Sequence, residues 1–282
     1  MNAGINLIDD YSLEMTGKDV PGLLEAQHAL PAGTRINVTF LGNEDLEMRI
    51  AAAKAVKQAG FTPVAHISAR RIASPGQLEE FLSALREVDA IENIFCVGGD
   101  PETPMGPYAS ALDVIQSGRL PEFGVKEVSI AGYPEGHPDI SDADLWDHLE
   151  RKSTALKEQD LDRVVLTQFG FDTDPVISWI REVRQRGIDA PLRIGVPGPA
   201  GIKRLLAFAR RFGVGANAMI VKKYGFSLTN LMGTAGPDRF VNELGALVED
   251  DPAAGDVGIH LYTFGGLLAT AEWAQKFRKD AS

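Results

Sequence analysis

Short β-branched segments alternate with helical segments along almost the whole of this 282-residue chain. Eight of the short segments have the length and composition of strands, and we expect them at 11–15, 34–40, 62–68, 93–98, 127–133, 163–169, 192–197 and 257–263. The intervening segments have apolar residues at helical spacing, most clearly 44–60, 75–88, 174–187, 201–213 and 238–250. Strands that alternate with helices predict parallel pairing through right-handed crossovers.

Eight is the number of strands that closes a (β/α)8 barrel, a fold whose usual size is about 250 residues. We therefore predict an α/β protein in which residues 1–282 form one domain with the (β/α)8, or TIM-barrel, fold. An open doubly wound sheet is the alternative, but it normally carries a glycine-rich phosphate-binding turn after its first strand. Residues 14–18 (EMTGK) do not form such a turn.

Composition excludes several classes of protein. The 28 basic and 39 acidic side chains give a net charge of −11, which argues against a nucleic-acid partner, since phosphate contacts need a basic face. Cys96 is the single cysteine, so an internal disulfide and a multi-cysteine metal site are excluded. No apolar run approaches the roughly 20 residues of a membrane span, and the N-terminus lacks the layout of a secretion signal. We expect a soluble, cytoplasmic protein.

Polar residues at the carboxyl ends of the strands are the candidates for a functional site, because the loops there form the active face of a barrel. Consecutive candidates from different strands are separated by 25 to 35 residues, about one strand–helix unit, so we expect their side chains to converge on one opening. These candidates are Glu14, Thr39, His66, Asp100, Tyr133 with the nearby His137, and Gln168.

Charged residues among the candidates have two interpretations each. Glu14 lies between apolar neighbours, which would raise its pKa and make it a general acid, or it is a solvated carboxylate at a strand end. Asp100 follows two glycines and either orients a bound group or caps a helix. Arg151 and Lys152 form either a solvated helix face or an anion site.

The uncharged and aromatic candidates are equally open. His66 and His137 are each a hydrogen-bonded structural residue or a ligand-binding one, and the absence of an H-x-x-H spacing argues against a zinc site. Tyr133 is either a core aromatic or a surface on which a planar ring stacks. Gln168 is the polar residue in an apolar strand, so its amide bonds a ligand or pins a loop.

Several motifs resemble those of the bacterial-type methylenetetrahydrofolate reductase family, in the family's order and spacing. The combination of the YPEGHP and TQFGFD segments is the specific part of this resemblance, which spans residues 12–264. The motifs are SLE (12–14), VAHIS (64–68), GGDP (98–101), PYAS (107–110), VSIAGYPEGHP (128–138), LTQFGFD (166–172) and HLYTF (260–264).

The resemblance implies a (β/α)8 barrel that binds FAD, takes a hydride from NADH or NADPH and converts 5,10-methylenetetrahydrofolate to 5-methyltetrahydrofolate in one-carbon metabolism and methionine biosynthesis. By position, Glu14 matches the general acid that opens the methylene bridge, Asp100 matches the carboxylate near the flavin and the pterin, and Gln168 with Phe169 matches the substrate contacts. Residues that match flavin contacts are Thr39, His66, Gly99, Asp100, Tyr108, Ala109, Ala131, Tyr133, His137, Arg151 and Lys152, the last two at the diphosphate.

The chain also departs from the family pattern. Residues 15–18 replace an aromatic residue and two prolines, Gly98 stands where an arginine is common, and glycines at 265–266 stand where an arginine often binds the folate tail. Lys222 or Lys223 is a hypothetical replacement for that last arginine.

Three functions remain open. The leading one is the reductase, with a folate substrate, a nicotinamide donor and a possible homo-oligomer formed through the outer helices. The second is a related folate enzyme that works without tightly bound flavin or mainly oxidises methyltetrahydrofolate. The third is a non-catalytic folate- or flavin-binding subunit, which the retention of both Glu14 and Asp100 disfavours.

Overall fold

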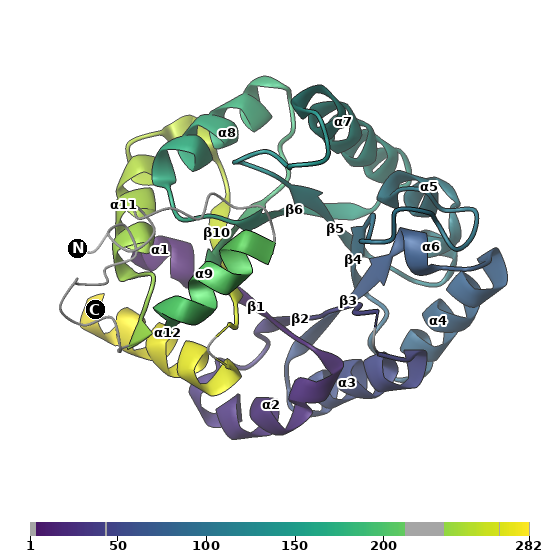
Figure 1. Ribbon diagram of the computed structural model, residues 1–282, viewed down its shortest axis with the longest axis horizontal. Coiled ribbons are helices and arrows are strands. Elements are labelled where there is room, and N and C mark those ends of the chain that lie inside the picture. The colour runs from purple at the N-terminus through teal and green to yellow at the C-terminus, as the bar shows by residue number, and fades with distance from the viewer. Residues whose placement is uncertain (1–3, 43, 212–233, 265, 282) are drawn as a thin grey trace.

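Eight parallel strands form a closed barrel that helices surround (Figure 1). The computed structural model describes residues 4–42, 44–211, 234–264 and 266–281. Each barrel strand pairs with the next one along the chain, and the last strand also pairs with the first, so the predicted (β/α)8 fold is confirmed. The barrel strands are β1 (Ser12–Met15), β2 (Arg35–Val38), β3 (Thr62–Ser68), β4 (Asn93–Val97), β5 (Glu127–Gly132), β6 (Asp162–Phe169), β7 (Leu192–Pro197) and β10 (Val257–Tyr262).

Helices follow the strands and form the outer ring. The α-helices are α1 (Ile5–Ile8), α2 (Val20–Ala26), α3 (Leu46–Gln58), α4 (Pro75–Glu87), α5 (Ala111–Gln116), α6 (Arg119–Glu122), α7 (Asp142–Glu158), α8 (Thr173–Gln185), α9 (Ile202–Arg211), α11 (Asp238–Glu249) and α12 (Leu267–Ala281). Short 3-10 helices are η1 (Gly17–Asp19), η2 (Gln27–Ala29), η3 (Ala69–Arg71) and η4 (Pro252–Ala254).

Local sequence signals explain where the helices begin and end. Helix α3 begins after Asp45, whose side chain accepts a hydrogen bond from the Met48 N–H, and the chain leaves the helix at Gly60 with φ of +87°. Helix α4 has Ser74 as its N-cap and Pro75 in its first turn. The strand bounds lie within two residues of the prediction, and 192–197 agrees at both ends.

Apolar side chains form one large core between the strands and the helices and a small cluster inside the barrel. The inner cluster consists of Val64, Phe95 and Leu166, from β3, β4 and β6, and forms the apolar floor of the barrel's open end. Among the described residues, no helix combines the length and the apolar character needed to cross a membrane.

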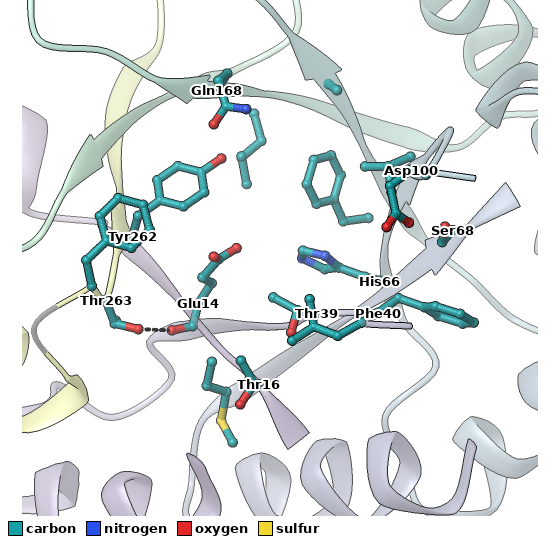
Figure 2. Close-up of a pocket in the computed structure, with 18 of the residues that line it drawn as sticks. Glu14, Thr16, Thr39, Phe40, His66, Ser68, Asp100, Gln168, Tyr262 and Thr263 are labelled. Carbon is teal, nitrogen blue, oxygen red and sulfur yellow. Dashed lines mark hydrogen bonds between the residues drawn. The ribbon is translucent and has the colours of Figure 1, made fainter. Parts of the chain in front are cut away.

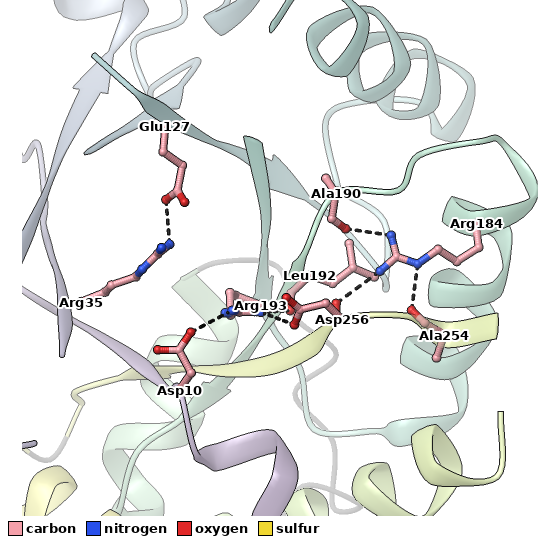
Figure 3. Close-up of polar contacts among 9 residues, drawn as sticks. All are labelled: Asp10, Arg35, Glu127, Arg184, Ala190, Leu192, Arg193, Ala254 and Asp256. Atoms are coloured by element: carbon pink, nitrogen blue, oxygen red, sulfur yellow. Dashed lines mark hydrogen bonds and ion pairs between the residues drawn. The ribbon is translucent and has the colours of Figure 1, made fainter. Parts of the chain in front are cut away.

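Ion pairs close the amino-terminal end of the barrel (Figure 3). Arg193 on β7 lies 2.9 Å from a carboxylate oxygen of Asp256 and 3.1 Å from one of Asp10. Across this end, Arg35 and Glu127, the first residues of β2 and β5, pair at 2.7 Å. Salt bridges fill this end, so the carboxyl ends of the strands are left for ligand binding.

A second, two-stranded antiparallel sheet lies beyond β7, where β8 (Ala200–Gly201) pairs with β9 (Thr234–Ala235). Helix α9 follows β8, and its Arg204 donates a hydrogen bond to the Phe264 carbonyl oxygen at 2.8 Å. This contact attaches α9 to the loop after β10, at the same end of the barrel as the predicted site. Lys222 and Lys223 lie outside the described residues.

Candidate active site

A cavity of about 460 Å³ opens at the carboxyl ends of the barrel strands. Figure 2 shows Glu14, His66 and Gln168, which come from β1, β3 and β6, facing one another across this cavity. The expectation that candidates from distant parts of the chain share one opening is therefore confirmed. The predicted site residues that line the cavity are Glu14, Thr39, His66, Gly99, Asp100, Ala131, Tyr133 and Gln168.

Glu14 combines a mostly buried carboxyl group with access to the cavity. Its side chain is 21 % exposed, and its backbone carbonyl oxygen accepts a 2.7 Å hydrogen bond from the Thr263 hydroxyl. Burial, together with the smaller effect of the negative charge of Asp19, raises the pKa of Glu14 to about 8. Glu14 is therefore protonated near neutral pH, in line with the first of its two interpretations from the sequence, and has the proton that a general acid needs.

His260 on β10 lies beneath Glu14, with its Nε2 4.0 Å from the Glu14 Oε2. The Ser12 hydroxyl contacts Nδ1 of the same ring at 2.8 Å, while Nε2 has no hydrogen-bond partner. Burial lowers the pKa of His260 to about 3, so the ring is neutral and supplies no positive charge that would ionise Glu14. The neutral ring therefore leaves the high pKa of Glu14 in place.

His66 is also a neutral, buried histidine. Its Nε2 lies 3.1 Å from Asn37 Oδ1, and its ring meets the edge of Phe95 with centroids 4.7 Å apart. Burial lowers the pKa of His66 to about 3, so with the Asn37 oxygen as acceptor we assign the ring proton to Nε2. Within the described part of the chain, no three His, Cys, Asp or Glu side chains meet as potential metal ligands.

Asp100 is held by an arginine that the sequence did not single out. Arg71 in η3 donates from Nε and Nη2 to the two carboxylate oxygens of Asp100 at 2.9 and 2.8 Å. The guanidinium lies against Gly42, where an added Cβ would come within 2.4 Å of Nη2. No helix begins at Asp100, because α5 is capped by Ser110, so the helix-cap interpretation of Asp100 is wrong.

Gln168 presents amide protons to the cavity. Its Oε1 accepts a hydrogen bond from the Phe169 N–H at 3.1 Å, which leaves the NH₂ group facing the cavity. Phe169 itself is 2 % exposed and packs edge-on against Tyr262 and Phe264 rather than lining the cavity. It therefore supports the two aromatic side chains that do line it, and its predicted contact with substrate stays a prediction.

The loop after β1 places a second carboxylate beside Glu14. The Thr16 N–H and hydroxyl both donate to Asp19 Oδ2 at 2.8 Å, which holds Asp19 on the cavity wall. Gly17 donates its N–H to Glu44 at 3.0 Å, and this bond ties the β1 loop to the loop after β2. Residues 15–18, which depart from the family pattern, therefore form an ordered part of the site.

The remaining predicted flavin contacts lie away from the cavity lining. Tyr108 is 6 % exposed, and the carbonyl oxygen of Ala109 accepts a hydrogen bond from Arg70 at 2.8 Å. His137 packs edge-on against Tyr133 with ring centroids 5.5 Å apart. Positions 151 and 152 both lie on α7, where the sequence puts them.

The family model for methylenetetrahydrofolate reductase matches residues 15–264. The chain belongs to this family. It is 27 % identical over 187 residues to "Methylenetetrahydrofolate reductase (NADH) 1" of Zea mays. The aligned region covers 62 % of this chain and 28 % of the maize protein. It is 27 % identical over 180 residues to "Methylenetetrahydrofolate reductase 2" of Saccharomyces cerevisiae, or 60 % of this chain and 26 % of the yeast protein. The match thus spans less than a third of these relatives.

A solved structure with the same fold is that of an uncharacterized Clostridium thermocellum protein that binds two copies of 5-methyl-5,6,7,8-tetrahydrofolic acid. The TM-score is 0.65, and the superposition covers 96 % of this chain and 95 % of that one. The sequences are only 10 % identical, so this likeness supports the barrel fold.

The cavity suits a planar ring. Val97, Ala131 and Leu166 provide apolar walls, and the hydroxyls of Thr39 and Ser68 are buried in the lining without a hydrogen-bond partner. Buried polar groups normally have partners, so these two hydroxyls are suited to the polar atoms of a bound ring system. This part of the site fits the ring of the flavin that the reductase family implies, and equally a pterin.

The diphosphate of FAD is not matched in the same way. Of the described residues that line the cavity, three are carboxylic acids and none is a lysine or an arginine. Arg151 pairs with Asp147 at 3.1 Å. Lys152 is only 8 % exposed and lies beside Cys96, and its burial lowers its pKa to about 8. The described lining therefore offers no lysine or arginine to the diphosphate of FAD, so its side chains do not fit that group.

Besides Asp19, sequence reasoning missed three residues that shape this site. Arg71 follows β3 in the run ARR, and a cation directly after a barrel strand is a signal that could have identified it. Tyr262 and Thr263 lie within the HLYTF motif at the end of β10 and line the cavity. Tyr262 donates its hydroxyl to the Thr167 carbonyl oxygen at 3.1 Å, so its ring is fixed in place.

Proposed function

We propose that this chain catalyses the interconversion of 5,10-methylenetetrahydrofolate and 5-methyltetrahydrofolate, with NADH or NADPH as the hydride donor. Membership of the methylenetetrahydrofolate reductase family supports this reaction class. The observation that carries the proposal is Glu14, a carboxyl group whose pKa of about 8 keeps it protonated on the floor of a cavity suited to a planar ring.

Glu14 supplies the proton that makes the methylene carbon reactive. It gives its proton to N10 of the folate, the C–N10 bond breaks, and the electron pair of that bond stays on N10. The resulting iminium at N5 accepts a hydride from the reduced nicotinamide, which leaves as the oxidised form, and a proton from water restores Glu14. Neutral His260 lies 4.0 Å away and does not compete for the proton.

Gln168 and the aromatic wall position the reactants. The Gln168 NH₂ group faces the cavity and is suited to a carbonyl oxygen of the pterin or of the nicotinamide. Tyr262 and Phe264, backed by Phe169, exclude water from one side of the cavity. Hydride transfer needs two rings in contact and shielded from water, and these walls favour that arrangement.

The FAD that the family resemblance implies stays a prediction for this chain. A lining with three carboxylic acids and no described lysine or arginine favours the second candidate, in which the hydride passes directly from nicotinamide to folate without resident flavin. A cofactor that stays bound for many turnovers needs cations at its diphosphate, whereas a donor that leaves after every turnover needs only brief contact. The donor's phosphates would then extend from the cavity mouth into solvent.

One assay tests both the reductase activity and the direct transfer of hydride. It measures reduction of 5,10-methylenetetrahydrofolate by the purified protein with NADH and with NADPH, each with and without added FAD. Turnover that FAD does not increase, from protein without the visible absorbance of flavin, supports direct transfer. Turnover only after FAD is added would reject direct transfer and keep the reductase. Binding of folate without turnover under any condition would reject the reductase in favour of a binding subunit. The cytoplasmic location and the homo-oligomer stay predictions.

A further inference from the structure

The three carboxylic acids of the cavity lining differ in charge and pairing. Glu14 is protonated near neutral pH because of its burial, and Asp100 is paired with Arg71 through two hydrogen bonds. Asp19 has no ion pair with any described residue, and its side chain accepts its two hydrogen bonds from Thr16 at Oδ2. The Asp19 Oδ1 on the cavity wall is therefore available to accept hydrogen bonds from a ligand.

The position of Asp19 is fixed by the fold of the β1 loop. Thr16 caps η1 and holds Oδ2 with two 2.8 Å bonds, and the Asp19 N–H donates back to the Thr16 carbonyl oxygen at 3.1 Å. Gly17 is anchored to Glu44 at 3.0 Å, and a Cβ at this glycine would lie 2.8 Å from the Met48 side chain. A carboxylate that is held in place loses little freedom when it binds a ligand.

We propose that Asp19 is the carboxylate that accepts a hydrogen bond from an N–H group of the reduced pterin ring. This inference rests on the proposed function. The family resemblance gives Asp100 a place near the pterin, but here both oxygens of Asp100 are bound by Arg71. A reduced pterin carries a 2-amino group and ring N–H groups, and an ionised carboxylate is a strong acceptor for such donors.

The folate, rather than the nicotinamide donor, is the partner that this location favours. Asp19 lies five residues beyond Glu14 in the loop that continues β1, and its charge acts directly on the Glu14 carboxyl. Glu14 gives its proton to a folate nitrogen in the proposed mechanism, so the neighbouring carboxylate faces the same molecule. A negative charge here also repels the phosphates of a dinucleotide.

The test compares Asp19→Asn with the wild-type protein in binding of 5-methyltetrahydrofolate, measured by calorimetry, and in turnover. We expect folate binding to weaken by about 10- to 100-fold, which is the range for the loss of one charge-assisted hydrogen bond, with no rise in the KM for NADH. Asp19→Glu, which keeps the charge, restores part of the affinity. Asp250→Asn is the matched control. It also removes one carboxylate, but Asp250 is exposed at the C-cap of α11, which precedes β10 at the end of the barrel opposite the cavity.

A pH profile separates ligand contact from a purely structural role. The titratable groups that face Glu14 are Asp19, His66, His260 and Tyr262. The two histidines and the tyrosine are neutral near neutral pH, and the charge that raises the pKa of Glu14 is that of Asp19. Loss of its charge in Asp19→Asn therefore moves the falling limb of turnover to lower pH, whereas Asp19→Glu, which keeps the charge, should leave the limb close to its wild-type position. Folate affinity of Asp19→Asn within two-fold of wild type would overturn the inference. Wild-type protein that binds no 5-methyltetrahydrofolate would overturn the proposed function as well.

Discussion

Replacement of Glu14 by glutamine should stabilise the protein, and increasingly so as the pH rises. The Glu14 carboxyl has a pKa of about 8 in the folded chain against 4.5 as its ordinary value, because burial disfavours the charged form. Below pH 4.5 the group is protonated in both the folded and the unfolded state, and the stability that protonation supports is fully present. Between 4.5 and 8 the unfolded chain loses this proton more readily than the folded one, so stability falls as the pH rises.

The magnitude follows from the two pKa values. A rise from 4.5 to about 8 corresponds to at most about 5 kcal/mol of folding free energy lost above pH 8, and the real loss is smaller because 21 % of the side chain is exposed. Glutamine has nearly the same shape and no charge, so Glu14→Gln escapes this loss.

Urea unfolding of wild-type protein and Glu14→Gln at a series of pH values from 5 to 9 measures the effect. We expect the difference in unfolding free energy to grow in favour of the variant up to about pH 8 and then to level off. Glu249→Gln, which neutralises an exposed carboxylate at the end of α11, serves as control and should show no such trend. A difference between Glu14→Gln and wild type that stays constant over this range would refute the assignment of Glu14 as a buried, neutral acid.

Three further predictions concern activity and stability. The kcat/KM for folate should fall about tenfold between pH 7 and pH 9, because the protonated fraction of Glu14 in the free protein drops from about nine tenths to about one tenth around a pKa of about 8; kcat/KM measured across this range checks it. Gly42→Ala should displace the Arg71 guanidinium, so Gly42→Ala, Arg71→Ala and the double variant should lower kcat/KM by similar factors; additive losses would contradict the contact. Arg193→Met should lower the unfolding free energy, measured with urea, by about 1–2 kcal/mol. The loss is small because the two partners of Arg193, Asp256 and Asp10, are largely solvated and stay hydrated when the arginine is lost.

The barrel was predictable because its signals are local and repeated. Most strands are short runs rich in β-branched residues, and the long helices α3, α4, α7 and α8 each begin at a side-chain cap, such as Asp45 of α3. The convergence of Glu14 and Gln168 on one cavity followed from the fold alone, since strand ends of a parallel barrel meet at one face. The confirmed expectations are thus those that depend on periodicity and on topology.

The pairing of charges was not predictable in the same way. Asp100 and Arg71 are 29 residues apart on neighbouring strand–loop units, and nothing in either local sequence indicates that they form an ion pair. Asp19 lies in a loop where residues 15–18 depart from the family pattern, so resemblance gave it no role. Its place on the cavity wall depends on the hydrogen bonds of Thr16, which only the folded loop reveals.

The loop after β1, which holds Asp19, and the segment after β3, which holds Arg71, bear on the departures from the family pattern at positions 15–18 and at Gly98. A Cβ at Gly98 would meet nothing within 4 Å, so local crowding at that atom does not exclude a side chain there. The guanidinium near Asp100 comes instead from Arg71 at the end of β3, and Gly42 provides the space for it. Because Asp100 and Arg71 are bound to each other, the Arg71 charge weakens Asp100 as an acceptor for a ligand. The β1 loop that departs from the family pattern provides Asp19 as an acceptor for pterin N–H groups without such a partner among the described residues. On this reasoning Arg71→Ala should free Asp100 as a competing acceptor, so Asp19→Asn should cost less folate affinity in that background than in the wild-type protein.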